Sequence, residues 1–187
     1  MARSIALCCA TEYENPVVKY ERLQLERTLS EAEGYMELGM PEFAVAGLQR
    51  RGKLVHASAR GCYLMGEALR DLGRYREAIY PLRRSVDLMP DDVRAWLALG
   101  WCYKRTGHLE RAIEALEQAL DFDPAEAVLH YNLACYWSLA HNRGRALDYL
   151  ARALDMDSNF RDLVNEESDF DPLRSDPGFK MLTSVVV

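Results

Sequence analysis

One stretch of the sequence decides the fold: residues 93–126, which read VRAWLALGWCYKRTGHLERAIEALEQALDFDPAE. Side chains in its first half have the i, i+3, i+4, i+7 spacing of one helix face: Trp96, Leu99, Gly100 and Tyr103. Its second half carries another such stripe: Ala112, Ile113, Leu116, Ala119 and Leu120. Gly107 separates the halves and Asp123-Pro124 ends the second, since glycine and proline terminate helices. The stretch therefore predicts an antiparallel helix pair.

The same pattern returns every 34 residues along the chain. Small residues share one column: Ala32, Gly66, Gly100 and Ala134. Leucines share a second, and turn residues a third: Leu48, Leu82, Leu116 and Leu150, then Gly39, Gly73, Gly107 and His141. A helix pair of this size cannot bury its apolar stripe alone, so successive pairs must stack. The period therefore predicts an all-α solenoid of stacked antiparallel helix pairs.

The unit at 93–126 resembles the tetratricopeptide repeat (TPR) in the following residues: Trp96, Leu99, Gly100, Tyr103, Gly107, Ala112, Leu116, Ala119 and Pro124. The units at 59–92 and 127–160 match with a few exchanges: Cys62, His141 and Ser158. The unit at 25–58 is degenerate, because Arg51, Gly52 and His56 are expected to break its second helix. The resemblance implies a right-handed superhelix whose first helices line a concave groove.

The ends of the chain differ from the repeats, and we expect three segments: a loose N-terminal extension (1–15), the solenoid (16–160) and a C-terminal cap (161–187). Asn15-Pro16 is typical of a helix start, and the first helix is expected to run to about Leu38. Pro81 should bend the helix that contains it.

The C-terminal stretch DFDPLRSDPGF (169–179) resembles the closing segment of many bacterial TPR proteins. Asp171-Pro172 and Asp176-Pro177 are each expected to begin a short helix, whose apolar residues cover the end of the stack: Phe170, Leu173, Phe179 and Leu182. The alternative is that Val185–Val187 forms a short motif that binds a groove in another protein.

Composition narrows the function. The 29 Asp and Glu against 23 Lys and Arg give a net charge of −6, and no basic block suggests nucleic acid or an anionic membrane as partner. No apolar run approaches the ~20 residues of a membrane span. The five cysteines, an odd number without paired spacing, favour reduced thiols in a cytoplasmic protein. Leu7-Cys8 resembles a lipoprotein cleavage site only weakly, because the apolar run before it is too short.

No catalytic motif is present, so we expect no enzyme activity, no cofactor and no metal. Three minor alternatives remain. His130 and Cys135 could share a metal across one helix turn, and Cys135 or Cys62 could be a reactive thiol. Residues 155–166 have the acidic spacing of a calcium loop, but Phe160 stands where that loop needs glycine.

The candidate site is the concave groove that the resemblance implies. Its expected residues are Arg60, Tyr63, Glu67, Arg94, Leu97, Trp101, Lys104, Arg105, Tyr131 and Asn132. They include an aromatic ladder, Tyr63, Trp101 and Tyr131, beside basic side chains. Trp96 already fills the core position of its unit, so Trp101 is expected in the groove; the alternative is that it packs between helices.

Such a groove suits a short partner segment with apolar anchors and one or two acidic residues. The Lys and Asn clamp of chaperone-binding TPR proteins is absent, because the lysine column reads Leu29, Tyr63, Leu97 and Tyr131. We therefore predict a non-catalytic adaptor for a protein or peptide partner. The alternative is a self-associating scaffold, a homo-oligomer of stacked copies.

Overall fold

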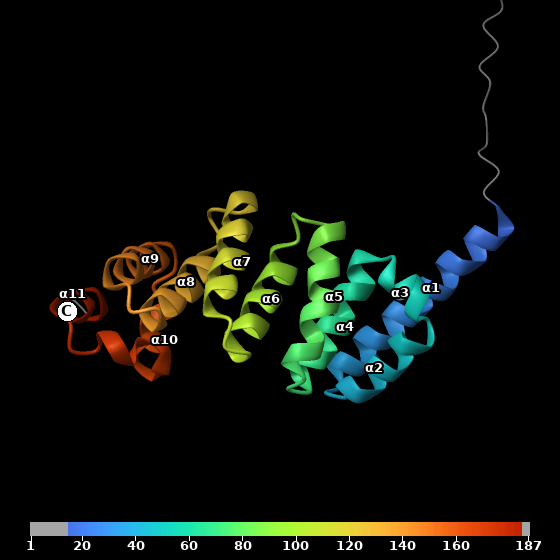
Figure 1. Cartoon of the computed structure of the whole chain (residues 1–187), viewed down its shortest axis with the longest axis horizontal. Helices are drawn as coiled ribbons and strands as arrows, with labels where there is room; N and C mark the ends of the chain where they lie inside the picture. Colours follow the sequence, from blue (N-terminus) through green and yellow to red (C-terminus); the bar gives the residue numbers. More distant parts are fainter. Residues whose placement is uncertain (1–14, 185–187) are drawn as a thin grey trace, which may run out of the picture.

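The computed structural model describes residues 15–184, which fold into a row of stacked helices (Figure 1). The α-helices are α1 (Pro16–Glu37), α2 (Pro41–Arg50), α3 (Gly52–His56), α4 (Ala59–Asp71), α5 (Tyr75–Leu88), α6 (Val93–Arg105), α7 (Leu109–Phe122), α8 (Ala127–Leu139), α9 (Arg143–Met156), α10 (Phe160–Glu166) and α11 (Pro177–Thr183). One 3-10 helix, η1 (Ser168–Leu173), lies between α10 and α11.

Consecutive helices pack as pairs: α1 with α2, α4 with α5, α6 with α7, and α8 with α9. Each pair also contacts the next, so the colours of Figure 1 run from blue to red along the row. One continuous apolar core passes through the whole stack. The predicted all-α helical solenoid is confirmed.

The first unit is the degenerate one that the sequence predicts. Its second helix is split at Arg51 into α2 and the five-residue α3. The start of α1 also follows the prediction, because the Asn15 side chain accepts a hydrogen bond from the backbone N–H of Val17 at 2.9 Å. Pro81 lies inside α5, which continues to Leu88.

The turns within the pairs depend on one backbone conformation. Gly39, Gly73 and Gly107 have φ of 68°, 71° and 82° at the ends of their first helices. His141 holds the same column in the last unit and has φ of 56° without being glycine. The left-handed conformation therefore recurs at each 34-residue step and reverses the chain direction.

The two helices of a pair approach closely at the glycine column. A Cβ atom on Gly66 would lie 2.4 Å from Leu82 Cγ, and one on Gly100 would lie 2.2 Å from Leu116 Cδ1. Both leucines are fully buried on the partner helix. A larger residue at either position would therefore force the facing leucine side chain to move.

At the repeat position of residues 62, 96 and 130, a side chain forms a hydrogen bond to the turn that joins one unit to the next. The Trp96 indole N–H donates to the Pro90 carbonyl at 2.7 Å, and His130 Nε2 lies 2.9 Å from the Pro124 carbonyl one repeat later. The Cys62 thiol holds the same place, 3.6 Å from the His56 carbonyl. Three different side chains thus bind the carbonyl six residues earlier.

The closing segment confirms one of its two predicted helix starts. Asp176 caps α11 by accepting hydrogen bonds from the N–H groups of Gly178 (2.8 Å) and Phe179 (3.1 Å). The predicted start at Asp171-Pro172 is wrong, because Pro172 lies inside η1, whose N-cap is Glu167. The 3-10 turn begins earlier because the Glu167 carboxylate accepts from the N–H of Asp169 at 3.1 Å.

Two expectations concern residues outside 15–184: the loose character of the segment before Asn15, and the alternative role of Val185–Val187. Within the described part of the chain, no helix combines the length and apolar character needed to cross a bilayer.

The glycine column gives a direct test of the packing. Gly66→Ala should lower the free energy of unfolding by about 1–3 kcal/mol, because the new methyl overpacks against Leu82. Gly34→Ala is the matched control, since Gly34 is also helical but has nothing within 4 Å of its Cβ direction. The control should be neutral or stabilising by up to about 1 kcal/mol. Urea denaturation measures both, and equal effects would contradict the packing account.

Candidate peptide-binding groove

Side chains of the first helices α1, α4, α6 and α8 converge on one side of the stack. Arg60 of α4 reaches α1, with Nε 2.9 Å from Glu33 Oε1 and Nη1 3.1 Å from Glu26 Oε2. The Arg94 guanidinium of α6 lies 5.2 Å from the centre of the Tyr63 ring of α4. These contacts between successive first helices show that the predicted columns share a surface.

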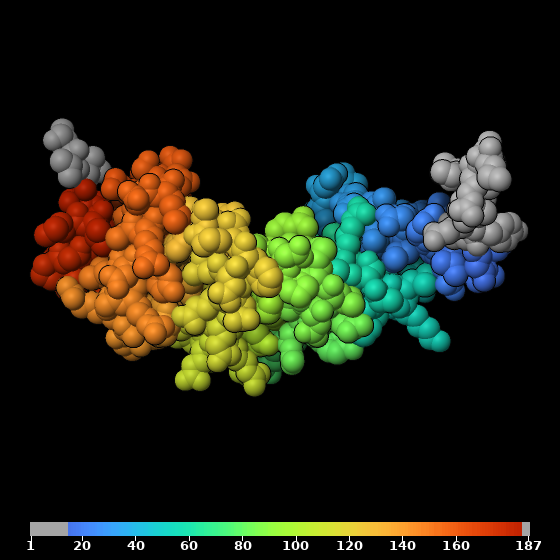
Figure 2. All heavy atoms as spheres, turned by 90° about the horizontal axis from the view of Figure 1, so that it is seen from above, coloured from blue at the N-terminus to red at the C-terminus, as the bar shows by residue number. Residues whose placement is uncertain are grey.

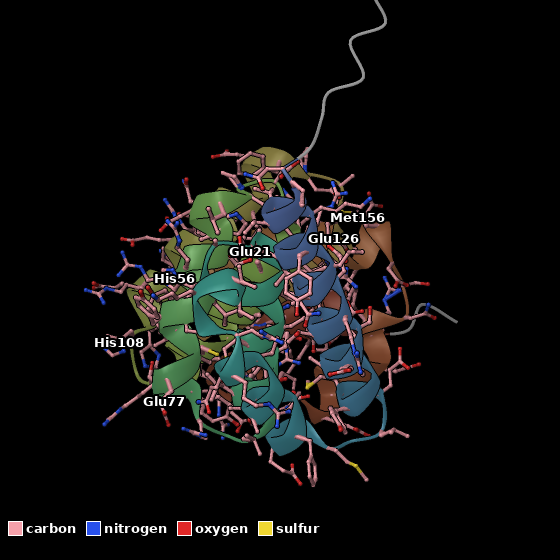
Figure 3. The ribbon with its side chains drawn as sticks, turned by 90° about the vertical axis from the view of Figure 1, so that its right-hand side faces the viewer. Glu21, His56, Glu77, His108, Glu126 and Met156 are labelled. Atoms are coloured by element: carbon pink, nitrogen blue, oxygen red, sulfur yellow. The ribbon has the colours of Figure 1, made fainter. Side chains whose placement is uncertain are left out.

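Two other views place this surface in the whole molecule. Figure 2 shows an elongated, curved body that is hollowed between its two ends. Figure 3 looks along the stack from its N-terminal end, with α1 in front and Glu77 and His108 at the opposite, lower-left edge. Glu77 is in the first turn of α5 and His108 is the N-cap of α7, so the starts of these two helices lie away from α1 in this view.

The expected groove residues between α1 and α6 differ in their exposure. Tyr63, Glu67 and Leu97 are half-buried there, whereas Arg60 and Arg94 are exposed. Arg94 is bound by Asp92 through two contacts of 2.9 Å. Burial and the charge of Glu67 raise the pKa of Tyr63 to about 12, so its phenol stays protonated at neutral pH.

Glu67 of α4 carries a carboxylate that is only partly compensated by its neighbours. Its carboxylate lies 3.0 Å from Arg70 Nη2, but its buried Oε1 atom has no hydrogen-bond partner within residues 15–184. Burial raises the pKa of this carboxyl group despite the nearby Arg70. This part of the groove therefore contains a carboxylate with an unused acceptor.

Trp101 is partly accessible to solvent, as a residue that contacts a partner must be. Its side chain is on α6 and the residue is 37% exposed, and the Lys104 ammonium lies 5.2 Å from the ring centre. Trp96, five residues earlier, is half-buried against the core and has its indole N–H bonded. The difference favours the groove over the alternative of packing between helices.

The C-terminal part of the groove is filled by the chain itself. Phe160 stacks on Tyr131 with ring centres 4.6 Å apart, and Phe170 meets the same ring edge-on at 5.8 Å. Tyr131 is therefore only 7% exposed. The predicted ladder of three open aromatic rings is wrong at Tyr131, because the closing segment covers it.

An ion pair fastens the closing segment to the groove. The Lys104 ammonium of α6 donates to Asp169 Oδ2 of η1, and both side chains are largely buried. The Cys135 thiol and the carboxylates of Glu167 and Asp169 come within 4.8 Å of one another. Lys104 supplies the cation that pairs with Asp169, and burial together with the charges of Asp169 and Glu167 raises the pKa of the Cys135 thiol.

The structure does not bring all predicted residues together. Arg105 lies over the Tyr75 ring at 5.2 Å, toward the start of α5. Asn132 is half-buried and donates through Nδ2 to the Val128 carbonyl of its own helix at 2.9 Å. His130, the alternative metal partner of Cys135, has its Nε2 at the Pro124 carbonyl instead.

Sequence reasoning missed Asp169, Glu167 and Phe160 as groove residues. The sequence did contain an indication of their role. The groove was expected to suit apolar anchors with an acidic residue, and the closing segment has that composition. The link needed the chain path, because 65 residues separate Lys104 from Asp169.

The described thiols have no features of nucleophiles. Cys62, Cys102 and Cys135 are unpaired and buried. Burial raises the pKa of Cys102 to about 11 and also raises the pKa of the other two above the ordinary value. Because the thiolate is the reactive form, these environments disfavour the alternative of a thiol enzyme.

Thiol reactivity can be measured directly in a Cys8→Ser/Cys9→Ser variant. The three remaining thiols should react with a disulfide reagent at pH 8 only as fast as the protein opens, and all three should react at once in denaturant. The reason is that the thiols are buried and, because burial raises their pKa values, protonated in the native protein, so the reagent meets a thiolate only after the protein opens. Rapid native modification of one cysteine at pH 7 would contradict this.

The Lys104–Asp169 pair should contribute to stability. Asp169→Asn leaves the ammonium without its counter-ion and should cost about 2–3 kcal/mol, because the side chains are only 16% and 10% exposed. Arg27→Gln breaks an exposed pair with Glu31 and should cost less than about 0.5 kcal/mol. Denaturant unfolding compares them, and equally small losses would show that the closing segment is not held by this pair.

Comparison with known proteins agrees with this geometry. A family model described as tetratricopeptide repeat matches residues 69–134. A solved structure of MamA is 26% identical with a TM-score of 0.69 and covers 76% of this chain and 84% of its own. MamA 41-end from Desulfovibrio magneticus RS-1 is 19% identical with a TM-score of 0.68, covering 85% of this chain and 93% of its own.

A third solved structure is YrrB, described as a TPR protein with an unusual peptide-binding site. It is 23% identical with a TM-score of 0.67 and covers 72% of this chain and 70% of its own. No curated protein matches the sequence significantly. Residues 69–134 therefore match the tetratricopeptide repeat, and the described chain shares the helical-solenoid fold of these solved structures.

Proposed function

We propose that the chain is a non-catalytic adaptor that binds a peptide segment or partner helix in the open groove, the part of the concave surface formed by α1, α4 and α6. The observation that carries this proposal is Trp101, which is 37% exposed and stands outside the apolar core of its unit. Exposed tryptophan beside arginine is the composition enriched at binding hot spots.

The shape of the open groove supports a segment rather than a small molecule. Apolar and charged side chains alternate along it: Arg60, Tyr63, Arg94, Leu97 and Trp101. An extended peptide or a helix can use such a row through several side chains at once. YrrB, described as a TPR protein with an unusual peptide-binding site, is a precedent for this use of stacked TPR helices.

Peptide display against the full-length chain tests the proposal. Selected peptides should bind wild type, and Trp101→Ala should weaken them by at least about tenfold, as loss of a hot spot does. Phe122→Ala is the matched control, because Phe122 is an exposed aromatic residue at the end of α7, outside the groove. Peptides that bind both variants equally, or no selected peptide at all, would overturn the proposal.

A self-associating scaffold is the second candidate, and one observation favours it. The first two turns of α1 expose four large apolar side chains: Val17, Val18, Tyr20 and Leu23. Apolar residues gathered at one end of a solenoid are suited to contact another copy. Analytical ultracentrifugation of the full-length protein used for peptide display distinguishes the two candidates. An adaptor stays monomeric at micromolar concentration, and a scaffold does not.

A further inference from the structure

The closing segment occupies the groove as a ligand would. Its Asp169 carboxylate binds the Lys104 ammonium of α6, and the adjacent Phe170 ring packs edge-on against Tyr131 of α8. Phe170 is fully buried in this position. An acidic residue followed directly by an aromatic one therefore uses a cation from one first helix and an apolar surface from the next.

The repeat places a comparable set of side chains one unit earlier, in the open groove. Counting back 34 residues, Arg70 takes the place of Lys104, Leu97 that of Tyr131, and Trp101 that of Cys135. Leu97 is half-buried and Trp101 is exposed, and the repeat register puts this apolar surface next to the Arg70 position, as Tyr131 is next to the Lys104 position. The same spacing of charge and apolar surface is thus present without a covering segment.

Arg70 can accept an additional carboxylate. Its side chain is 34% exposed, and its contacts with Glu67 (3.0 Å) and Asp71 (3.3 Å) both come through Nη2. Those partners are neighbours on the same helix, and such partly exposed local pairs are weak. A guanidinium has five N–H donors, so a carboxylate of a bound segment can join these contacts.

We propose that the open groove binds partner segments in which a carboxylate residue directly precedes an aromatic residue, in the register of Asp169-Phe170 shifted by one repeat toward the N-terminus. The carboxylate pairs with Arg70, and the aromatic ring packs on Leu97 and Trp101. This inference rests on the adaptor function proposed above and specifies the chemistry of the partner.

The partner segment binds beside the closing segment and does not replace it. Phe170 and Phe179 are buried against each other with ring centres 5.5 Å apart, so removing the closing segment would expose both rings to water. Lys104 lies between the two positions, since it binds Asp169 and also lies over the Trp101 ring.

The probe is a fluorescein-labelled peptide with the sequence of residues 166–174, EESDFDPLR, titrated with the full-length protein at constant ionic strength. Fluorescence anisotropy should show saturable binding. In the peptide, replacing the aspartate that copies Asp169 by asparagine, or the phenylalanine that copies Phe170 by alanine, should each weaken binding at least tenfold. In the protein, Trp101→Ala should do the same, and Phe122→Ala should have no effect.

Arg70→Met decides where the peptide binds. It should weaken binding at least tenfold if the peptide lies in the open groove. If the peptide exchanges with the chain's own closing segment, Arg70→Met leaves the affinity unchanged, and that result overturns the inference. The absence of saturable binding overturns it as well.

The display selection separates this inference from the adaptor function. Selected peptides that depend on Trp101 and carry the acidic–aromatic pair support both proposals. Peptides that depend on Trp101 but lack this pair overturn the partner chemistry and leave the adaptor function standing. A selection that yields no Trp101-dependent peptide overturns both.

Discussion

The close approach of two helices at the glycine column is the constraint on which the stack depends. At Gly66 and Gly100 the absence of a Cβ atom lets a leucine of the partner helix reach the backbone of the first helix. This contact sets the thickness of the α4–α5 and α6–α7 pairs, and alanine, the next smallest residue, holds the same column in the other two pairs (Ala32 and Ala134). The groove follows from this close packing, because its width and curvature are the sum of the steps from one pair to the next.

The turns between pairs are held by a side-chain hydrogen bond that different residue types can make. Trp96, His130 and Cys62 differ in size and polarity, yet each places a hydrogen-bonding group against the carbonyl six residues earlier. The residues that carry these carbonyls, His56, Pro90 and Pro124, are exposed, so each bond contributes about the 0.5–1.5 kcal/mol of an ordinary hydrogen bond. The exchanges that make these repeats irregular in sequence therefore preserve the geometry between units.

The closing segment has two roles in the structure. It covers the apolar end of the stack, where Phe170 and Phe179 are buried, and it fills the last part of the groove through Phe160 and the Lys104–Asp169 pair. The groove proposed for a partner is consequently shorter than the solenoid and ends near Trp101. The acidic closing segment forms its boundary on the C-terminal side. Asp169 of that segment neutralises the charge of Lys104 there.

The amino-acid sequence by itself determined the helix pairs, their period, the glycine turns and the broken second helix of the first unit, because each depends on side chains within one or two helical turns. The cap by Asp176 is local in the same sense and was predicted correctly. Only the tertiary structure decided which groove residues are open. Tyr131 is covered by Phe160 and Phe170, and Arg105 turns toward Tyr75, because these contacts depend on the chain path and on competition between partners distant in sequence.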